Sequence, residues 1–187
     1  HGLVRDETGK KMSKSLGNSI DPNLMIDRYG ADAVRLSLII GTSPGNDSKI
    51  SETKIKAYKH FANKIWNATR FVLENTSDSD WANSSQPKDS RDQTYLTALN
   101  ALVKEVTDDM NNYRFYLAGE KLYHYFWYSF ADQIIEEIKQ RWKNETNEEA
   151  SQSGRLVLVK ILQTNLKLLH PFMPHLTELI WQIIPTA

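Results

Sequence analysis

Two lysines and two serines near the N-terminus have the residue types and the spacing to hold a phosphate group. Lys11 and Lys14 lie three positions apart in the segment KKMSKSLGN, and Ser13 and Ser15 place a hydroxyl on each side of Lys14. A lysine ammonium has three donors and no acceptor, which suits a phosphate oxygen. Polar residues beside a Gly-Asn pair are also typical of an ordinary solvated loop, so the residues alone leave both interpretations open.

The elements that must position this loop are short. We expect a strand over residues 3–5 before it and two helices after it, over 22–30 and 31–40. The first helix begins with a proline and both are followed or closed by a glycine, which are typical start and stop signals. Glycines flank the lysines and apolar anchors are few, so we expect the loop to be mobile when no phosphate is bound.

The rest of the chain has the pattern of a helix bundle. Apolar residues recur at steps of three and four in five segments: 52–75, about 95–110, an aromatic-rich stretch at 115–143, 155–169, and the residues after Pro174. The polar segment 76–92 is predicted to be a loop. We therefore predict a mainly α chain with an antiparallel helix bundle over 51–187, preceded by a strand-loop-helix segment over 1–50.

The composition is that of a soluble globular protein, with 40% hydrophobic and 25% charged residues. No run of about 18 apolar residues is long enough to cross a membrane. The chain has no cysteine, which excludes disulfides and thiolate zinc sites and is compatible with a cytoplasmic location. Residues 1–75 hold 12 basic and 8 acidic side chains, whereas 76–187 hold 11 and 15, so an anionic partner is expected on the N-terminal side.

Residues 11–15 match, letter for letter, the KMSKS signature of the class I aminoacyl-tRNA synthetases, and the wider segment HGLVRDETGKKMSKSLGNSIDP resembles the members of that class for branched aliphatic amino acids. SPGND followed by NKIWNATRFVLEN is similar to the valyl enzymes. Three further blocks agree with the family in order: 30–35, 63–71 and 170–175. The resemblance covers nearly the whole chain and is thinnest across 76–92 and 144–154.

The resemblance implies a role for the loop in ATP chemistry. In this family the signature loop closes over ATP while the amino acid is activated, so Lys14 would steady the phosphates as pyrophosphate departs and Lys11 would assist. Met12, Ser13 and Ser15 would complete the ATP-binding segment, with hydroxyl or backbone donors from the two serines. Mg²⁺ is expected on the phosphates, but no carboxylate stands in a recognisable ligand pattern, so we assign no metal residue.

The resemblance also implies that the helix bundle binds the anticodon region of a tRNA. Single-stranded bases are read by aromatic or guanidinium stacking and by amide hydrogen bonds. Five residues of the helix at 52–75 offer these groups: Asn63, Trp66, Asn67 and Arg70 lie on an arc away from its apolar face, and Phe71 lies near the boundary. Trp66 and Phe71 could equally belong to the core.

The absence of a nucleotide-binding segment limits the function that we expect of this chain. The family needs a Rossmann nucleotide-binding fold with a His-Ile-Gly-His type motif, and no such segment occurs. We therefore expect a fragment of a longer ATP-dependent valine-tRNA ligase, inactive alone and with a monomeric parent. An isoleucyl enzyme, or a non-catalytic helical module that binds tRNA or protein, remains an alternative.

Other chemistry-bearing residues are better explained by structure. His170 and His175 bracket two prolines but lack a further ligand for a metal. The aromatic band at 123–130 has helical spacing and is predicted to pack in the core more readily than to stack on bases. Asp32 and Arg35 lie one helical turn apart and can pair locally. The glutamates at 136–137 and 145–149 are predicted to be solvated.

Overall fold

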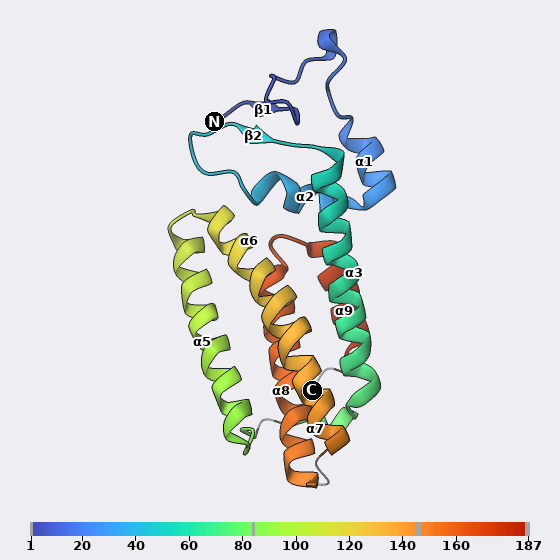
Figure 1. The fold of residues 1–187 in the computed structure, drawn as a ribbon, viewed down its shortest axis with the longest axis vertical. Coiled ribbons are helices and arrows are strands. Elements are labelled where there is room, and N and C mark those ends of the chain that lie inside the picture. The colour runs from blue at the N-terminus through green and yellow to red at the C-terminus, as the bar shows by residue number, and fades with distance from the viewer. Residues whose placement is uncertain (1, 84, 145–146, 186–187) are drawn as a thin grey trace.

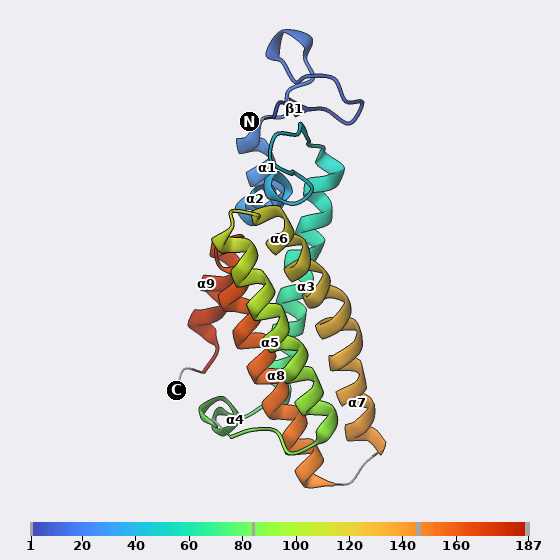
Figure 2. The same ribbon diagram turned by 90° about the vertical axis from the view of Figure 1, so that its left-hand side faces the viewer.

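The computed structural model describes residues 2–83, 85–144 and 147–185. Long helices run side by side along the molecule, and a smaller N-terminal part with two short strands covers one end (Figures 1 and 2). The elements follow one another as β1 (Val4–Arg5), α1 (Pro22–Tyr29), α2 (Ala31–Ile39), β2 (Ser48–Lys49), α3 (Glu52–Asn75), α4 (Asp78–Ala82), α5 (Ser90–Asn111), α6 (Phe115–His124), a π-helical segment (Tyr125–Ile134), α7 (Ile135–Asn144), α8 (Glu148–Leu169) and α9 (Pro174–Ile183). The predicted mainly α fold is confirmed.

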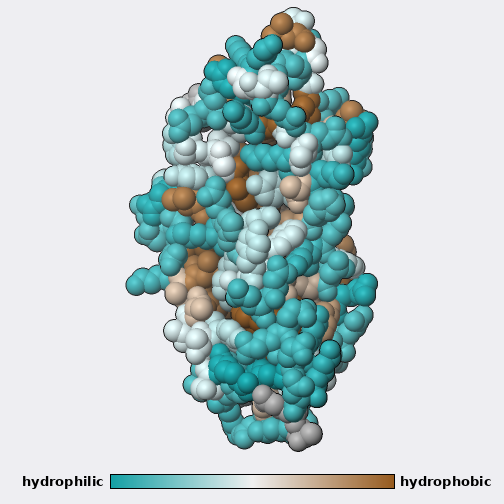
Figure 3. Space-filling view, viewed as in Figure 1, coloured by the Kyte–Doolittle hydropathy of each residue, from teal (hydrophilic) through white to brown (hydrophobic). Residues whose placement is uncertain are grey.

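The main core lies between α3, α5, α8 and the continuous run from α6 to α7. Phe61, Phe126 and Phe130 are fully buried in it together with several aliphatic side chains of α8. Helix α8 buries residues on most of its circumference, which is the pattern of a central helix. The long side chains of the outer faces are mostly polar, and Figure 3 shows a largely hydrophilic surface on the side drawn in Figure 1.

A second, smaller core holds the N-terminal part together. Met25, Ala33, Val34 and Ile50 are buried in it with Ile55, which comes from the first turns of α3. Helix α3 therefore contributes Ile55 to the small core and, one to two turns later, Phe61 to the main core. It is one continuous helix of 24 residues, about 36 Å long, that joins the two parts.

The two strands pair in parallel, with Val4 opposite Ser48 and Arg5 opposite Lys49. Asp47, directly before β2, supports this pair because one of its carboxylate oxygens accepts the N–H of Leu3 at 2.7 Å and the other lies against the Arg5 guanidinium. The hydrogen bond from the Leu3 N–H, followed by the hydrogen bond and the charge of Arg5, lowers the pKa of Asp47. The first strand is thereby fixed to the segment that leads into α3.

The spacing of Asp32 and Arg35 on α2 suggests a local pair, but in the structure the two side chains do not pair with each other. Asp32 is buried, and its two carboxylate oxygens accept the N–H of His175 at 3.3 Å and of Leu176 at 2.6 Å. These N–H groups lie in the first turn of α9 and have no acceptor within the helix, and the N-cap of α9 supplies no side-chain acceptor. Arg35 donates to the carbonyl of Pro171 at 3.1 Å. Helix α2 thus holds the corner between α8 and α9.

Two polar segments form helices that the sequence pattern did not predict. Within the expected loop at 76–92, Ser77 and Asp80 form a capping box that starts α4, and the indole of Trp81 is buried. Helix α8 begins seven residues earlier than predicted because Asn147 accepts hydrogen bonds from the first turn. Glu145 lies outside the described residues. In the described part of the chain, no helix is long and apolar enough to span a membrane.

Candidate phosphate loop and RNA-facing helix

The lysine loop begins from a short hairpin at the end of the molecule opposite α7 (Figure 1). The N–H of Met12 donates to the carbonyl of Val4 at 3.0 Å, and the N–H of Asp6 donates to the carbonyl of Lys10 at 2.9 Å. The hairpin turns at Gly9, whose φ of 84° favours glycine. β1 therefore has β2 on one side and the start of the loop on the other.

The tip of the loop is a single 3₁₀ turn over Lys14–Leu16. The N–H of Leu16 donates to the carbonyl of Ser13 and the N–H of Gly17 to that of Lys14, both at 3.2 Å. Gly17 has a φ of 67°, a left-handed conformation that a side chain would strain. Leu16 is 68% exposed, so no apolar contact holds the tip against the rest of the protein.

The predicted phosphate-binding side chains differ in what they face. Lys11 and Lys14 are exposed, and within the described residues neither ammonium forms a hydrogen bond or an ion pair. Ser13 and Ser15 share a hydrogen bond between their hydroxyls at 2.8 Å. Met12 packs against the small core and anchors the loop at its base. The loop thus presents two free cations to solvent beside a hydroxyl pair, an arrangement that can receive phosphate oxygens.

The base of the loop carries two residues that sequence reasoning did not assign to the site. Asp6 accepts hydrogen bonds from Thr8 and from the N–H of Lys10, and its second oxygen accepts the Asn18 amide at 2.7 Å. The Asn18 and Thr8 side chains lower the pKa of Asp6 to about 2. The sequence signal was the Gly-Asn pair after the lysines, which indicates a turn but not its partner.

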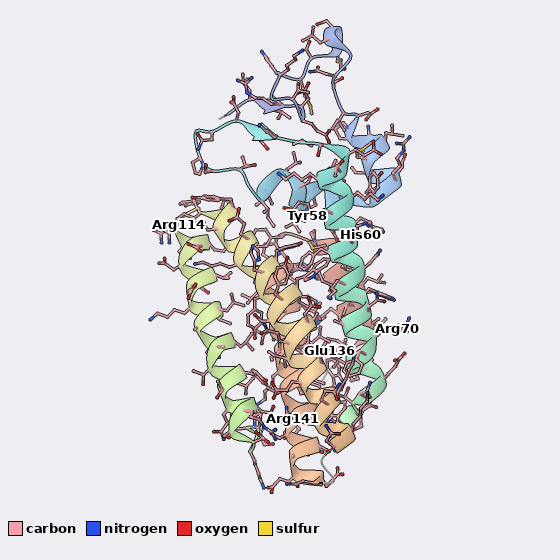
Figure 4. The ribbon with its side chains drawn as sticks, in the orientation of Figure 1. Tyr58, His60, Arg70, Arg114, Glu136 and Arg141 are labelled. Atoms are coloured by element: carbon pink, nitrogen blue, oxygen red, sulfur yellow. The ribbon has the colours of Figure 1, made fainter. Side chains whose placement is uncertain are left out.

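The residues proposed to face RNA fall into two groups. Asn63, Asn67 and Arg70 are exposed on one stripe of α3. Arg70 forms an ion pair with Glu74 at 3.4 Å in which both side chains are more than 60% exposed, and such a pair is weak. In Figure 4 the Arg70 side chain lies on the side of α3 away from α7. Its guanidinium is available to an approaching base or phosphate.

Trp66 and Phe71 are half-buried and pack against the main core. The Phe71 ring stacks on Trp142 of α7, with centroids 6.2 Å apart and planes at 24°. The ammonium of Lys139 lies 4.5 Å from the centre of the same ring. These neighbours give the Phe71 ring a structural role in the contact between α3 and α7.

The remaining candidates have structural partners. The ring of His170 is hydrogen-bonded to the hydroxyl of Thr177 at 2.9 Å. Over the residues that the structure describes, no three His, Cys, Asp or Glu side chains gather as a metal site would need. In the aromatic band, Phe126 and Phe130 are buried, whereas His124 and Tyr128 are exposed and stack on each other with centroids 5.6 Å apart.

Comparison with known families identifies the two parts. The family model described as the anticodon-binding domain of tRNA ligase matches residues 92–187, just over half of the chain. The chain belongs to this tRNA ligase family. A second model, described as tRNA synthetases class I (I, L, M and V), matches residues 1–51, which contain the lysine loop. The two models together cover the lysine loop and most of the helix bundle.

Similar tRNA ligases are much longer than this chain. The valine–tRNA ligase of Thermotoga maritima is 49% identical over all 187 residues, and that of Bacillus subtilis is 46% identical over 99% of the chain. In both cases the chain spans 21% of the relative's length. The homologous region is thus about one fifth of a whole ligase.

Solved structures of tRNA ligases share the fold. The Mycobacterium tuberculosis methionyl-tRNA synthetase bound by methionyl-adenylate matches with a TM-score of 0.78 at 22% identity, covering all of this chain and 38% of the other. The ternary complex of Agrobacterium radiobacter K84 agnB2 LeuRS with tRNA and LeuAMS matches with a TM-score of 0.72 at 24% identity, covering 97% of this chain and 21% of the other.

Proposed function

We propose that this chain is part of an ATP-dependent valine–tRNA ligase. Residues 1–50 are the end of its catalytic domain and residues 51–187 are its helical anticodon-binding domain, and the parent works in the cytoplasm as a monomer. Relatives at 46–49% identity are valine–tRNA ligases, which favours this reading over an isoleucyl enzyme. The match of residues 1–51 to the synthetase model, together with the free lysines, disfavours a non-catalytic module.

The observation that carries the proposal is the pair of free ammonium groups on the exposed loop. In activation, a carboxylate oxygen of valine forms a bond to the α-phosphorus of ATP and the bond to pyrophosphate breaks, so negative charge develops on the departing phosphates. Lys14, at the tip, stabilises this charge, and Lys11 supports it from the base. The serine hydroxyls and backbone N–H groups add donors, and the protein forms no covalent bond.

Mg²⁺ normally accompanies ATP phosphates through one or two protein carboxylates and several waters. Asp6 lies at the base of the loop, but its hydrogen bonds to Thr8, Lys10 and Asn18 already occupy it, and no three His, Cys, Asp or Glu side chains gather among the described residues. The described residues therefore do not fit a metal site at the loop. We assign no metal ligand in this chain and route no step through the ion.

For the bundle, we propose that the anticodon loop of the tRNA lies along the exposed stripe of α3. Asn63 and Asn67 donate and accept hydrogen bonds with base edges, and the Arg70 guanidinium stacks on a base or pairs with a phosphate. Trp66 and Phe71 border this stripe and support it from the core side. The family match to an anticodon-binding domain supports the assignment of the partner.

Replacing Lys14 with alanine in the full-length ligase tests the phosphate role. Valine-dependent ATP–pyrophosphate exchange should slow by about 10²- to 10³-fold, the range for the loss of one preorganised donor. Valine binding should be nearly unchanged, because the lysine acts on charge that develops in the transition state. Lys10→Ala is the matched control, an exposed lysine outside the signature. A wild-type exchange rate in Lys14→Ala would overturn the assignment.

A further inference from the structure

The side chain of Asn18 ties the two ends of the lysine loop together. Its Oδ1 accepts the N–H of Ser13 at 2.9 Å, and its Nδ2 donates to the Asp6 carboxylate at 2.7 Å and to the carbonyl of Lys11 at 3.2 Å. The network fixes the orientation of the amide, since the reverse orientation would point its oxygen at a carboxylate and a carbonyl. One side chain thus contacts the hairpin and the loop on both sides of Met12.

These contacts hold the residue from which the turn with Lys14 begins. The loop leaves its base at Ser13, passes through the 3₁₀ turn and returns at Gly17, directly before Asn18. Lys14 therefore directly follows Ser13, whose N–H donates to Asn18. The tip has no apolar anchor, because Leu16 is exposed. Asn18 therefore closes the base on which the turn with Lys14 is built, on the other side of Met12, whose N–H is bonded to Val4 and whose side chain packs on the small core.

We propose that Asn18 is a positioning residue of the phosphate loop, which acts by holding Lys14 at the place where its ammonium meets the phosphates of ATP. This inference rests on the proposed phosphate role of Lys14. Asn18 itself uses its amide groups on the protein and contributes no charge. A displacement of about 1 Å in a catalytic group can cost about 10²-fold in rate, so a residue that never touches ATP can control activation.

The first experiment is Asn18→Ala in the full-length valine–tRNA ligase, measured by valine-dependent ATP–pyrophosphate exchange. We expect kcat to fall about 10- to 100-fold while KM for valine stays the same. Asn23→Ala is the matched control, because Asn23 is an exposed asparagine of α1 whose side chain forms no hydrogen bond within the described residues. An unchanged kcat in Asn18→Ala, with Lys14→Ala slow, would overturn the inference and leave the phosphate role intact.

A double-mutant cycle shows whether Asn18 acts through Lys14. If it does, Asn18→Ala should change the rate less than ~2-fold in a Lys14→Ala background, because the group that it positions is gone. A general loss of folding would instead lower both backgrounds equally, and that result would overturn the inference. A wild-type rate in Lys14→Ala alone would overturn the proposed function itself.

An exchange of the two groups at the base provides a rescue. Asn18→Asp keeps the acceptor for Ser13 but sets a second carboxylate against Asp6, so we expect it to be at least as slow as Asn18→Ala. Adding Asp6→Asn restores a donor opposite that carboxylate, and part of the rate should return. No recovery in the double variant, with thermal stability equal to the wild type, would count against the hydrogen bond between the two positions as the positioning contact.

Discussion

Asp6 is a solvent-accessible carboxylate surrounded by donors. Three of them belong to its own turn, from Thr8 and Lys10, and the fourth is the Asn18 amide. Hydrogen bonds to the charged form favour ionisation, and the Asn18 side chain makes the largest contribution to the lowered pKa. The base of the lysine loop is thus held by an acidic group that stays charged over the whole physiological range.

The titration of Asp6 gives a direct prediction. Its pKa is about 2 in the folded chain, below its ordinary value of 3.8, so its contribution to stability is present above pH 3.8 and is lost as the pH falls through about 2. NMR titration of the side-chain carboxyl carbon should give a midpoint near pH 2 in the wild type. In Asn18→Ala the midpoint should rise toward the ordinary value. An ordinary midpoint in the wild type would contradict the network.

The structure reduces the number of loop residues whose amides should exchange fast. Glycines and exposed lysines alone predict fast amide exchange across residues 10–16. The N–H groups of Met12 and Ser13 are hydrogen-bonded to Val4 and Asn18, however, so only the tip should exchange fast. Hydrogen exchange resolved by NMR should find Lys14 and Ser15 at least about tenfold faster than Met12 and Ser13. Protection of the whole tip without ATP would count against a loop that closes on phosphate.

Helix α3 was predictable because local signals agree with its packing. Ser51 caps its first turn, apolar residues recur on one face, and its bounds are those of the sequence pattern. Helix α4 was missed because its five residues are too few and too polar to show a period, although the Ser77–Asp80 capping box and the burial of Trp81 stabilise it. The partners of Asn18 and Phe71, which are Asp6 and Trp142, could not be predicted because no local pattern links residues that far apart in the sequence.

Arg70 and Phe71 should behave differently when replaced by alanine. Arg70 is exposed, so Arg70→Ala should leave the melting temperature unchanged and weaken tRNA binding by roughly 1 to 3 kcal/mol, the worth of one stacked base. Glu74→Gln is the control, because it removes the ion-pair partner and keeps the guanidinium. Affinities are compared for valine tRNA with its own and a changed anticodon. Equal losses for both RNAs would show that Arg70 does not read the anticodon.

Phe71→Ala should combine a smaller effect on RNA with a loss of stability. The ring is stacked on Trp142, and aromatic pairs contribute about 0.5 to 1.5 kcal/mol beyond the area that they bury. We expect a lower urea midpoint for Phe71→Ala and a loss of tRNA affinity that Phe71→Leu largely restores. An affinity loss in Phe71→Leu equal to that in Phe71→Ala, with normal stability, would instead assign base stacking to the ring.

Across the whole molecule, the first and last thirds of the chain meet at α2. Asp32 supplies the acceptor that the first turn of α9 lacks, and Arg35 holds the preceding carbonyl of Pro171. The loop-bearing segment is therefore attached to the bundle through α3, through Leu36 and Ile40, which are buried in the main core, and through this corner. The hydrogen bonds of Asp32 and Arg35 have no sequence signal, because the partners are more than 130 positions apart.

Removal of the Asp32 carboxylate should destabilise the chain. Asp32→Ala leaves two N–H groups of α9 without their acceptor at a partly buried site, and we expect a loss of about 1 to 2 kcal/mol in the free energy of unfolding. Arg35→Ala, which removes one exposed hydrogen bond, should cost less than half as much. Urea unfolding followed by circular dichroism measures both. Equal stability of Asp32→Ala and the wild type would show that the cap in trans contributes nothing.

Because α3 runs unbroken through both cores, it fixes the distance between the N-terminal part, which carries the lysine loop, and Arg70. Eighteen residues of unbroken helix separate Glu52, beside the N-terminal part, from Arg70, which corresponds to about 27 Å. A linker of the same length would let the spacing vary, whereas a helix buried at Ile55, Phe61 and Ile65 does not. An RNA that contacts Arg70 is then held at a set height along the molecule whatever its sequence. In the complex that we propose, the shape of the RNA is then a criterion of selection separate from its bases.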